Sequence, residues 1–273
     1  MEFVRGAPHP ALAGAVVRYT GFAERAAGPV RFRELPCTYV PVIIDLDVGW
    51  SVADARRPER SPERLGSFVA GLTDGPVLVE HDGSARCLQV DLAPLAARRL
   101  LGLPMSELAN RSVALEDVLG RPAGELVERV AAAPSWADGF ALVDRALMAR
   151  LEEAPPADPG VAWSLGRLAG SGGATPIGEL VRELGWSHRR LIARFRDAVG
   201  LPPKLVARIV RFERLGGILA AEAGVDMARA AAECGFFDQA HLAREVRDLA
   251  GVTPTELRAA GGNSVQDDLA LPA

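Results

Sequence analysis

The stretch Met227-Ala228-Arg229-Ala230-Ala231-Ala232-Glu233-Cys234-Gly235-Phe236-Phe237-Asp238-Gln239-Ala240-His241-Leu242 decides the fold of the C-terminal part of the chain. Its small apolar residues recur at helical spacing as far as Gly235, where a glycine ends the helix. Asp238 can cap a second helix, which Leu242 anchors and which stops at a Gly-x-x-Pro sequence beginning at Gly251. Two helices joined by a tight glycine turn form a helix-turn-helix unit.

The same pattern occurs once before in the chain. Leu191, Phe195, Gly200 and Pro203 repeat the spacing of Leu242, Val246, Gly251 and Pro254, and Gly185 takes the place of Gly235. Residues 204–221, between the two units, have the pattern of one helix, which would span roughly 25 Å at ~1.5 Å per residue. A spacer of that length can place the second helix of each unit, the reader helix, about one DNA turn (~34 Å) from the other.

Charge is distributed unevenly over the two units. The whole chain of 273 residues has a formal net charge of −4, which argues weakly against nucleic acid as a partner. Between Thr175 and Leu215, however, nine basic residues face four acidic ones, whereas between Gly216 and Gly262 four basic residues face seven acidic ones. The first unit therefore has the electrostatic character of a DNA-binding surface and the second does not.

Residues from about 163 to 260 resemble the DNA-binding domain of the AraC/XylS family of bacterial transcription regulators. The match is strongest over 232–246 and continues through 251–258. The resemblance implies two helix-turn-helix subdomains joined by a helix. The exposed face of each reader helix, together with the resemblance, gives the candidate DNA-binding residues: His188, Arg189, Arg190, Ile192, Ala193, Arg196, Gln239, Ala240, His241 and Arg244.

Arg189 and Arg244 are the best candidates for direct contact with bases. The family often has polar residues where this chain has Ile192, Ala193 and Ala240, and apolar side chains there can still contact a thymine methyl group. Each candidate also has a structural alternative. Arg189 can be a solvated surface charge, Arg244 can pair with Asp248 one turn later, and His241 can serve capping or packing.

The N-terminal part is β-rich, and we predict an α+β sensor-like domain there. Strands are expected at 38–48, 67–70, 77–80 and 87–92, the last two joined as a hairpin by an Asp-Gly turn at 81–84. Helices are expected from Pro94 onward, and the apolar face of the helix at 135–151 can pack on the sensor or on a second subunit. The family layout implies a cupin-like sandwich or barrel that holds a small effector. Tyr39, Trp50, Phe68 and also Cys37 could line its pocket, although each is equally explained as core.

These patterns divide the chain into four segments. We predict a sensor domain at 1–153, a linker with a short helix at 154–173, a double helix-turn-helix domain at 174–262 and a flexible tail at 263–273. Three prolines at 155–159 and the glycines at 170–173 mark the linker. An effector bound to the sensor domain would then act by changing this joint.

The remaining observations limit the class of protein. No apolar run approaches the ~18–20 residues of a membrane span, and the N-terminus does not have the layout of a signal peptide, so we expect a cytoplasmic protein. The three cysteines are far apart and form no C-x-x-C motif, and we expect no metal, cofactor or catalytic residues. The prediction is a transcription regulator and not an enzyme, with double-stranded DNA, a small-molecule effector, RNA polymerase and a homodimer partner as candidate partners. The alternative is a cupin-type enzyme fused to a helical interaction module.

Overall fold

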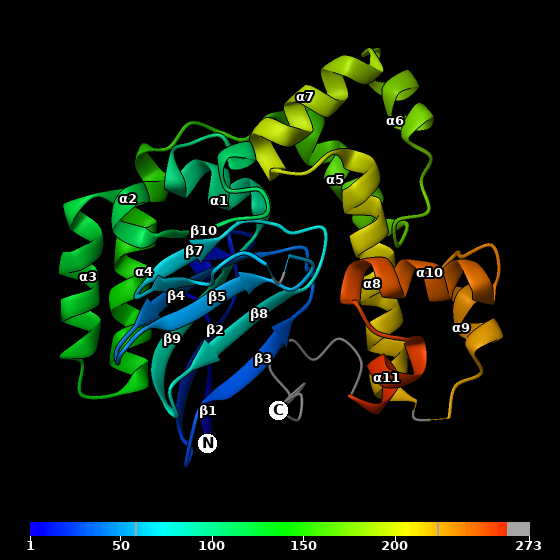
Figure 1. Cartoon of the computed structure of the whole chain (residues 1–273). Coiled ribbons are helices and arrows are strands. Elements are labelled where there is room, and N and C mark those ends of the chain that lie inside the picture. The colour runs from blue at the N-terminus through cyan, green and yellow to red at the C-terminus, as the bar shows by residue number, and fades with distance from the viewer. Residues whose placement is uncertain (58, 223, 261–273) are drawn as a thin grey trace.

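The computed structural model describes residues 1–57, 59–222 and 224–260 of the chain. It has a β-rich N-terminal domain of two antiparallel sheets followed by a helical C-terminal domain (Figure 1). The tail predicted at 263–273 lies outside the described residues. Across the described residues, no helix combines the length and the apolar character that crossing a bilayer requires.

The larger sheet of the N-terminal domain has six strands in the order β1-β2-β9-β4-β7-β10. These strands are β1 (Glu2–Gly6), β2 (Val16–Arg25), β4 (Val40–Asp45), β7 (Phe68–Ala70), β9 (Ser84–Leu92) and β10 (Ser112–Ala114). One face of this sheet is covered by helices, and the other face meets the second sheet. Hydrophobic side chains from β2, β4, β7 and β9 therefore point to both faces, as expected of a sheet buried on two sides.

The smaller sheet has four strands in the order β3-β8-β5-β6. These strands are β3 (Val30–Glu34), β5 (Trp50–Asp54), β6 (Glu63–Leu65) and β8 (Val77–His81). A separate hydrophobic cluster that includes Phe22, Ile43, Trp50 and Phe68 lies where the two sheets face each other. The sandwich thus has a core between its sheets that is distinct from the core under the helices.

The hairpin predicted at 77–92 is wrong. The strands β8 and β9 do follow each other, but β8 pairs with β3 and β5, whereas β9 pairs with β2 and β4. Gly83, with φ +96°, makes the turn in the left-handed region that favours glycine. The Asp-Gly turn therefore carries the chain from one sheet to the other, because each strand finds better-matched partners elsewhere.

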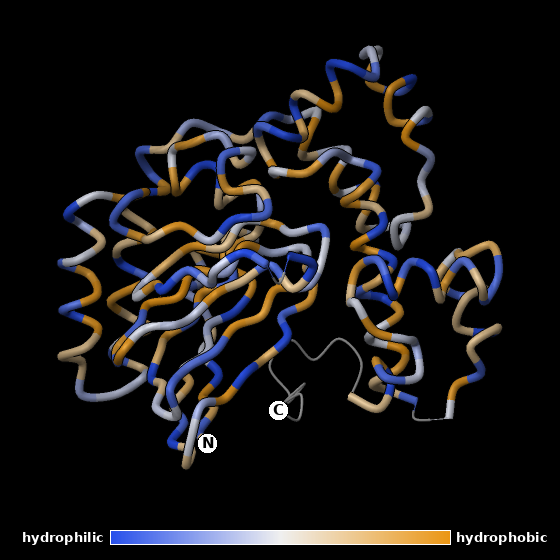
Figure 2. The backbone as a smooth tube through the Cα atoms, in the orientation of Figure 1, coloured by the Kyte–Doolittle hydropathy of each residue, from blue (hydrophilic) through white to orange (hydrophobic). Residues whose placement is uncertain are grey.

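Helices cover the outer face of the six-stranded sheet. They are η1 (Pro10–Leu12), α1 (Pro94–Leu101), η2 (Met105–Glu107), α2 (Leu115–Leu119), α3 (Arg121–Ala131) and α4 (Trp136–Glu153). Helix α4 lies directly on the sheet, since a Cβ placed on Gly6 or Gly21 would come within 2.5 Å of the ring of Phe140 or Trp136. Hydropathy varies periodically along α3, as expected of a helix with one buried face (Figure 2). The apolar face predicted at 135–151 therefore packs on its own domain.

The C-terminal domain contains two helix-turn-helix units joined by a long helix, as the sequence repeat predicts. Its helices are α5 (Pro159–Gly170), α6 (Ile177–Leu184), α7 (His188–Val199), α8 (Pro203–Ala221), α9 (Met227–Glu233), α10 (Gln239–Ala250) and α11 (Pro254–Ala259). The first unit is α6 and α7, the second is α9 and α10, and α8 runs between them (Figure 1). The reader helices are α7 and α10.

Helix α5 occupies most of the segment 154–173 that was predicted as a linker. Asp158 caps it by accepting from the backbone N–H groups of Gly160 and Val161. Val161 and Leu168 are fully buried, and α5 packs on α7 and α8. This segment is therefore packed against the first unit, which leaves it little freedom to act as a joint.

Candidate nucleic-acid interface and ligand pocket

The first unit positions α7 through a glycine turn and a cap. Gly185, with φ +63°, ends α6, and Ser187 caps α7 by accepting from the backbone N–H of Arg190 at 3.2 Å. Leu191 and Phe195 are fully buried beneath α7. The opposite face of α7 is consequently held out to solvent at a fixed angle.

That face presents the predicted residues of α7. His188, Arg189, Arg190, Ala193 and Arg196 are exposed, and Ile192 is half-buried. The Arg190 guanidinium stacks on the ring of Trp186, 4.6 Å from its centroid, while Arg194 pairs with Asp158 at 3.2 Å.

Arg189 and Arg196 are the arginines of α7 that have no such engagement within the described residues. Their guanidinium groups are therefore available to a phosphate or a base edge without breaking an internal contact.

The second unit repeats this arrangement at α10. Gly235 has φ +75°, and Asp238 caps α10 by accepting from the backbone N–H of His241 at 2.6 Å. His241 is engaged locally: its Nδ1 accepts from the backbone N–H of Phe237, and its ring packs edge-on against Phe236. The structural alternative for His241, capping and packing, thus describes its position.

The other predicted residues of α10 are free on its surface. Gln239, Ala240 and Arg244 are exposed. Asp248, the alternative partner of Arg244, instead accepts a hydrogen bond from Arg208 of α8 at 3.1 Å.

Arg208 also fixes α10 to the central helix. Its Nε donates to Glu245 at 2.8 Å, so that one guanidinium binds two carboxylates of α10. The acidic charge of α10 is partly neutralised within the domain by this contact. The second reader helix thereby gains its orientation from α8.

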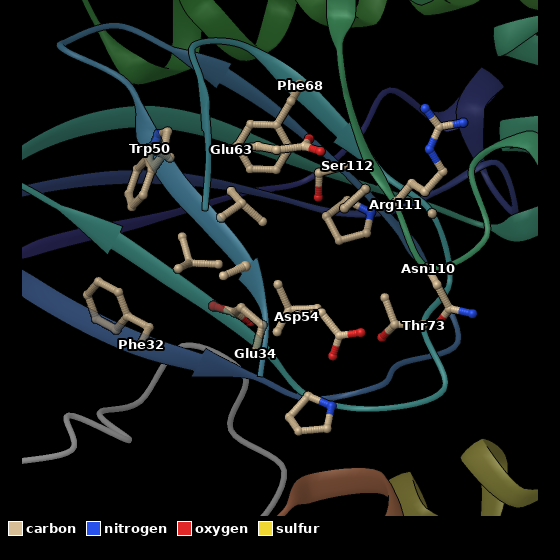
Figure 3. A pocket seen from close by; sticks show the side chains of 18 of the residues that line it. Phe32, Glu34, Trp50, Asp54, Glu63, Phe68, Thr73, Asn110, Arg111 and Ser112 are labelled. Atoms are coloured by element: carbon tan, nitrogen blue, oxygen red, sulfur yellow. The ribbon is translucent and has the colours of Figure 1, made fainter. Parts of the chain in front are cut away.

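A cavity of about 730 Å³ lies between the two sheets of the N-terminal domain (Figure 3). Trp50 and Phe68, both predicted as pocket residues, line it, and so does Cys37. Phe22 and Phe32 complete a largely aromatic wall. The size and the apolar character are those of a site for a small organic molecule.

Tyr39, the third predicted pocket residue, does not line this cavity. Its side chain is buried beyond the cavity lining, on the same face of the sheet, where its hydroxyl accepts from Nη2 of Arg18 at 2.8 Å. Arg18 also pairs closely with buried Asp91. Alternation gives Tyr39 the same face as the lining residues Pro41 and Ile43, so the error concerns its place along the sheet: Tyr39 lies with Arg18 and Asp91, past the end of the cavity lining.

Glu34 is a pocket residue that the sequence analysis missed. It ends β3, lines the cavity and lies near Asp91 and Arg18. Burial, and then the nearby charge of Asp91, raise the pKa of the Glu34 carboxyl to about 8, against the opposing effect of Arg18. An acid in a strand of mixed charge, Val30-Arg31-Phe32-Arg33-Glu34, gave no signal that it faces inward.

The N-terminal domain contacts both units of the C-terminal domain directly. Glu213 of α8 accepts from the backbone N–H and the hydroxyl of Thr38, at 2.9 and 2.7 Å. Arg33 of β3 donates to the carbonyl of Ala250 at the end of α10, at 3.2 Å. Arg98 of α1 pairs with Asp197 near the end of α7 at 3.3 Å.

These contacts join residues that are far apart in the chain, so no local pattern predicts them. Thr38 follows Cys37 of the cavity wall by one position, and Arg33 lies between the cavity residues Phe32 and Glu34. The cavity wall and the contacts with the reader domain are therefore parts of the same segments. In the part of the chain that the structure describes, no three His, Cys, Asp or Glu residues are grouped so as to hold a metal ion.

Comparison with protein families assigns both halves of the chain. Residues 180–260 match a family described as a helix-turn-helix domain, and residues 4–114 match a domain of unknown function. Residues 180–260 form an AraC-type helix-turn-helix domain, which confirms the resemblance for this part of the chain. No curated protein matches the chain.

Solved structures of ToxT from Vibrio cholerae share the two-domain fold. A 1.65 Å structure is 10% identical and has a TM-score of 0.50, covering 88% of this chain and 98% of ToxT. A structure with an unsaturated fatty acid bound is 8% identical at a TM-score of 0.50, covering 93% and 96%. A third, bound to a methylnaphthalenyl butenoic acid, is 11% identical at 0.50, covering 88% and 98%. At this identity the likeness establishes the fold, a β-rich domain followed by a helical one.

Proposed function

We propose that this protein is a sequence-specific transcription regulator of the AraC type. The observation that carries the proposal is the pair of capped reader helices, each fixed by a buried stripe and each presenting an exposed polar face. Helix α8, with 19 residues, spans roughly 28 Å between them, which suits successive major grooves on one face of DNA. Arg189, Arg196, Gln239 and Arg244 are the contacts we assign first, with His188, Arg190, Ile192, Ala193, Ala240 and His241 beside them.

The cavity of the N-terminal domain is the proposed effector site. It is closed by aromatic side chains, and the ToxT structures of the same fold are described with a fatty acid and with a synthetic carboxylic acid bound. Control would pass through the contacts of Thr38 and Arg33 with α8 and α10, since both residues adjoin the cavity wall. Because α5 is packed on α7 and α8, these contacts replace the joint at 154–173 as the proposed route.

The alternative function, a cupin-type enzyme, has no support from the chemistry of the cavity. Its two thiols are those of Cys37 and Cys87. Burial raises the pKa of both thiols well above the usual range, which keeps them protonated and unreactive. Measurement of bound metal in the purified protein is the direct test of this alternative.

The proposed regulator acts in the cytoplasm on double-stranded DNA. RNA polymerase and a second copy of the chain are further candidate partners in the same proposal.

Selection of genomic DNA fragments by the purified full-length protein tests the function. We expect a compact motif enriched upstream of genes. The double variant Arg189→Ala/Arg244→Ala should lose the enrichment, whereas Arg129→Ala, which removes an exposed arginine from α3, should keep it. Enrichment that is equal for all three proteins would show that the reader helices do not contact DNA.

A further inference from the structure

The wall of the cavity is built from aromatic rings that surround its inner end. Phe22, Trp50 and Phe68 are almost completely buried, and Phe32 completes the wall from β3. The ring centroids of Phe22 lie 6.3 Å from those of Trp50 and 6.4 Å from those of Phe32. Aromatic faces attract cations, and the attraction grows where water is excluded.

Carboxylates are the charged groups directed toward this space. Glu34, Asp54 and Glu63 come from three strands of the smaller sheet and border the cavity (Figure 3). Asp54 already accepts from Arg56. Within the described residues, Glu34 and Glu63 form no ion pair, so their carboxyl groups are open to a ligand. The Glu34 carboxyl, whose pKa is about 8, is charged at the higher end of the pH range.

The arginines around the cavity are either engaged or at its rim. Arg56 binds Asp74 at 2.6 Å, and Arg57 lies 3.7 Å from Asp54. Arg111 donates to the carbonyl of Glu107 at 3.2 Å, and its guanidinium points away from the cavity (Figure 3).

Arg60, like Arg111, is a lining arginine without an ion pair in the described residues, and it is exposed. Glu34, in contrast, is partly buried and lines the cavity beside Leu35 and two positions from Phe32. The inner end of the cavity is therefore aromatic and acidic.

We propose that this cavity binds lipophilic organic cations, an ammonium group carried on an apolar body, with the charge held between the aromatic rings and the carboxylate of Glu34. The proposal rests on the effector-binding function proposed above and specifies its ligand class. It separates this chain from the ToxT structures of the same fold, whose described ligands are carboxylic acids. An anionic head group would meet Glu34, and the arginine nearest to Glu34, Arg18, is already bound to Asp91 and Tyr39.

Three probes of one shape and different charge test the ligand class. Calorimetric titration of the full chain at pH 8.5 would compare phenylbutyltrimethylammonium, phenylbutanol and phenylbutyrate. We expect the cation to bind at least tenfold more tightly than the alcohol and the carboxylate to bind most weakly. Equal or tighter binding of the carboxylate would overturn the proposal, and so would the absence of any heat with the cation.

Variants locate the charge that selects the ligand. Glu34→Gln should weaken cation binding about tenfold and leave the alcohol unchanged, while Glu128→Gln, at an exposed site on α3, should change neither. Arg60→Gln should not affect the cation. Thermal unfolding of each variant shows that it is folded. Loss of cation binding in Arg60→Gln but not in Glu34→Gln would place the ligand at the rim and refute the proposed site.

A pH series gives a second readout. The titratable and charged groups near the Glu34 carboxyl are Asp91 and Arg18 of the six-stranded sheet, with Cys37 and Tyr39 beside them, and Asp54 and Glu63 line the same cavity. Because the pKa of Glu34 in the empty cavity is about 8, a permanent cation must displace a proton at lower pH. Its affinity should fall about tenfold from pH 8.5 to pH 6.5 in the native protein and stay constant in Glu34→Gln.

The two proposals fail separately. Enrichment of a DNA motif by the same preparation, without cation binding, would leave the regulator intact and remove the ligand class. Cation binding without any enriched motif would keep the ligand class and remove the DNA-binding function.

Discussion

The two helix-turn-helix units have the same backbone plan and differ in their surroundings. Around α7 basic residues predominate, and Arg189 and Arg196 are unengaged. Along α10 the acids Glu245 and Asp248 are bound to Arg208 of α8, so this helix is oriented by an internal ion pair. We propose from this difference that the first unit provides most of the attraction to phosphate and that the second provides a rigidly placed face for contact with bases.

The N-terminal domain also holds the two units differently. It meets α7 at its end through Arg98 and Asp197 and through the backbone of Met105, which a Cβ on Gly200 would approach to 3.0 Å. Among the described residues, it meets the end of α10 through a hydrogen bond from Arg33 to a helix-end carbonyl and through Pro76 beside Gly251. The second unit is thus the one with fewer restraints from the sensor domain.

Removing a core side chain from each unit has the largest expected effect. Leu191→Ala and Leu242→Ala, at fully buried equivalent positions, should each lower the free energy of unfolding of their unit by about 2–5 kcal/mol. Leu191→Ala should abolish most DNA affinity, whereas Leu242→Ala should keep non-specific binding. Urea unfolding measures the loss of stability, and DNA titration measures the loss of affinity. Equal losses of non-specific binding in the two variants would contradict the proposal that the first unit provides most of the attraction to phosphate.

The second largest effect is expected from losing a direct contact with a DNA base. Arg189→Ala should weaken specific DNA binding by ~1–3 kcal/mol because a bidentate contact with a base is lost. Arg129→Ala on α3 is the matched control. An unchanged affinity in titrations with the selected motif would mean that Arg189 is a solvated surface charge.

Salt dependence distinguishes the units in a finer way. Each lost phosphate contact should reduce the slope of log affinity against log salt by about one. Arg189→Ala/Arg196→Ala should flatten the slope more than Arg244→Ala/Arg247→Ala does. Identical slopes in the two double variants would show that the uneven charge is not how the protein meets DNA.

The contacts with the sensor domain are expected to be the weakest. Arg33→Ala removes one partly buried hydrogen bond and should cost about 0.5–1.5 kcal/mol of unfolding free energy, whereas Arg98→Ala breaks a largely exposed pair and should cost about 0–1 kcal/mol. Hydrogen exchange should show faster opening at the end of α10 in Arg33→Ala. Protection that is unchanged there would exclude a role for this bond.

The reader units could be predicted from sequence because their determinants are local. Gly185 and Gly235 adopt positive φ, Ser187 and Asp238 cap the helices that follow, and the buried stripes recur at helical spacing. A single window of about twenty residues contains each of these signals. The alternative for Arg244 needed the structure, since it depended on Arg208 from another helix.

The sensor domain was only partly predictable because strand pairing is not local. The Asp-Gly turn before Ser84 is compatible with a hairpin and equally with a passage between two sheets. Trp50 and Phe68 line the cavity, but Tyr39 lies beyond its lining beside Arg18, and Glu34 gave no signal of its inward position. Which face of a strand is buried is decided by the partner strands, which the sequence does not reveal.

The alternation of side chains along β3 connects the cavity with the end of α10. Phe32 and Glu34 face the cavity, and Arg33 between them holds the end of α10. Linkage requires that a ligand which changes DNA affinity through this strand has its own affinity changed by the same factor when the protein is on DNA. The operator is then itself an effector of the cavity, so the sensitivity of the sensor in a cell depends on how many binding sites its genome contains.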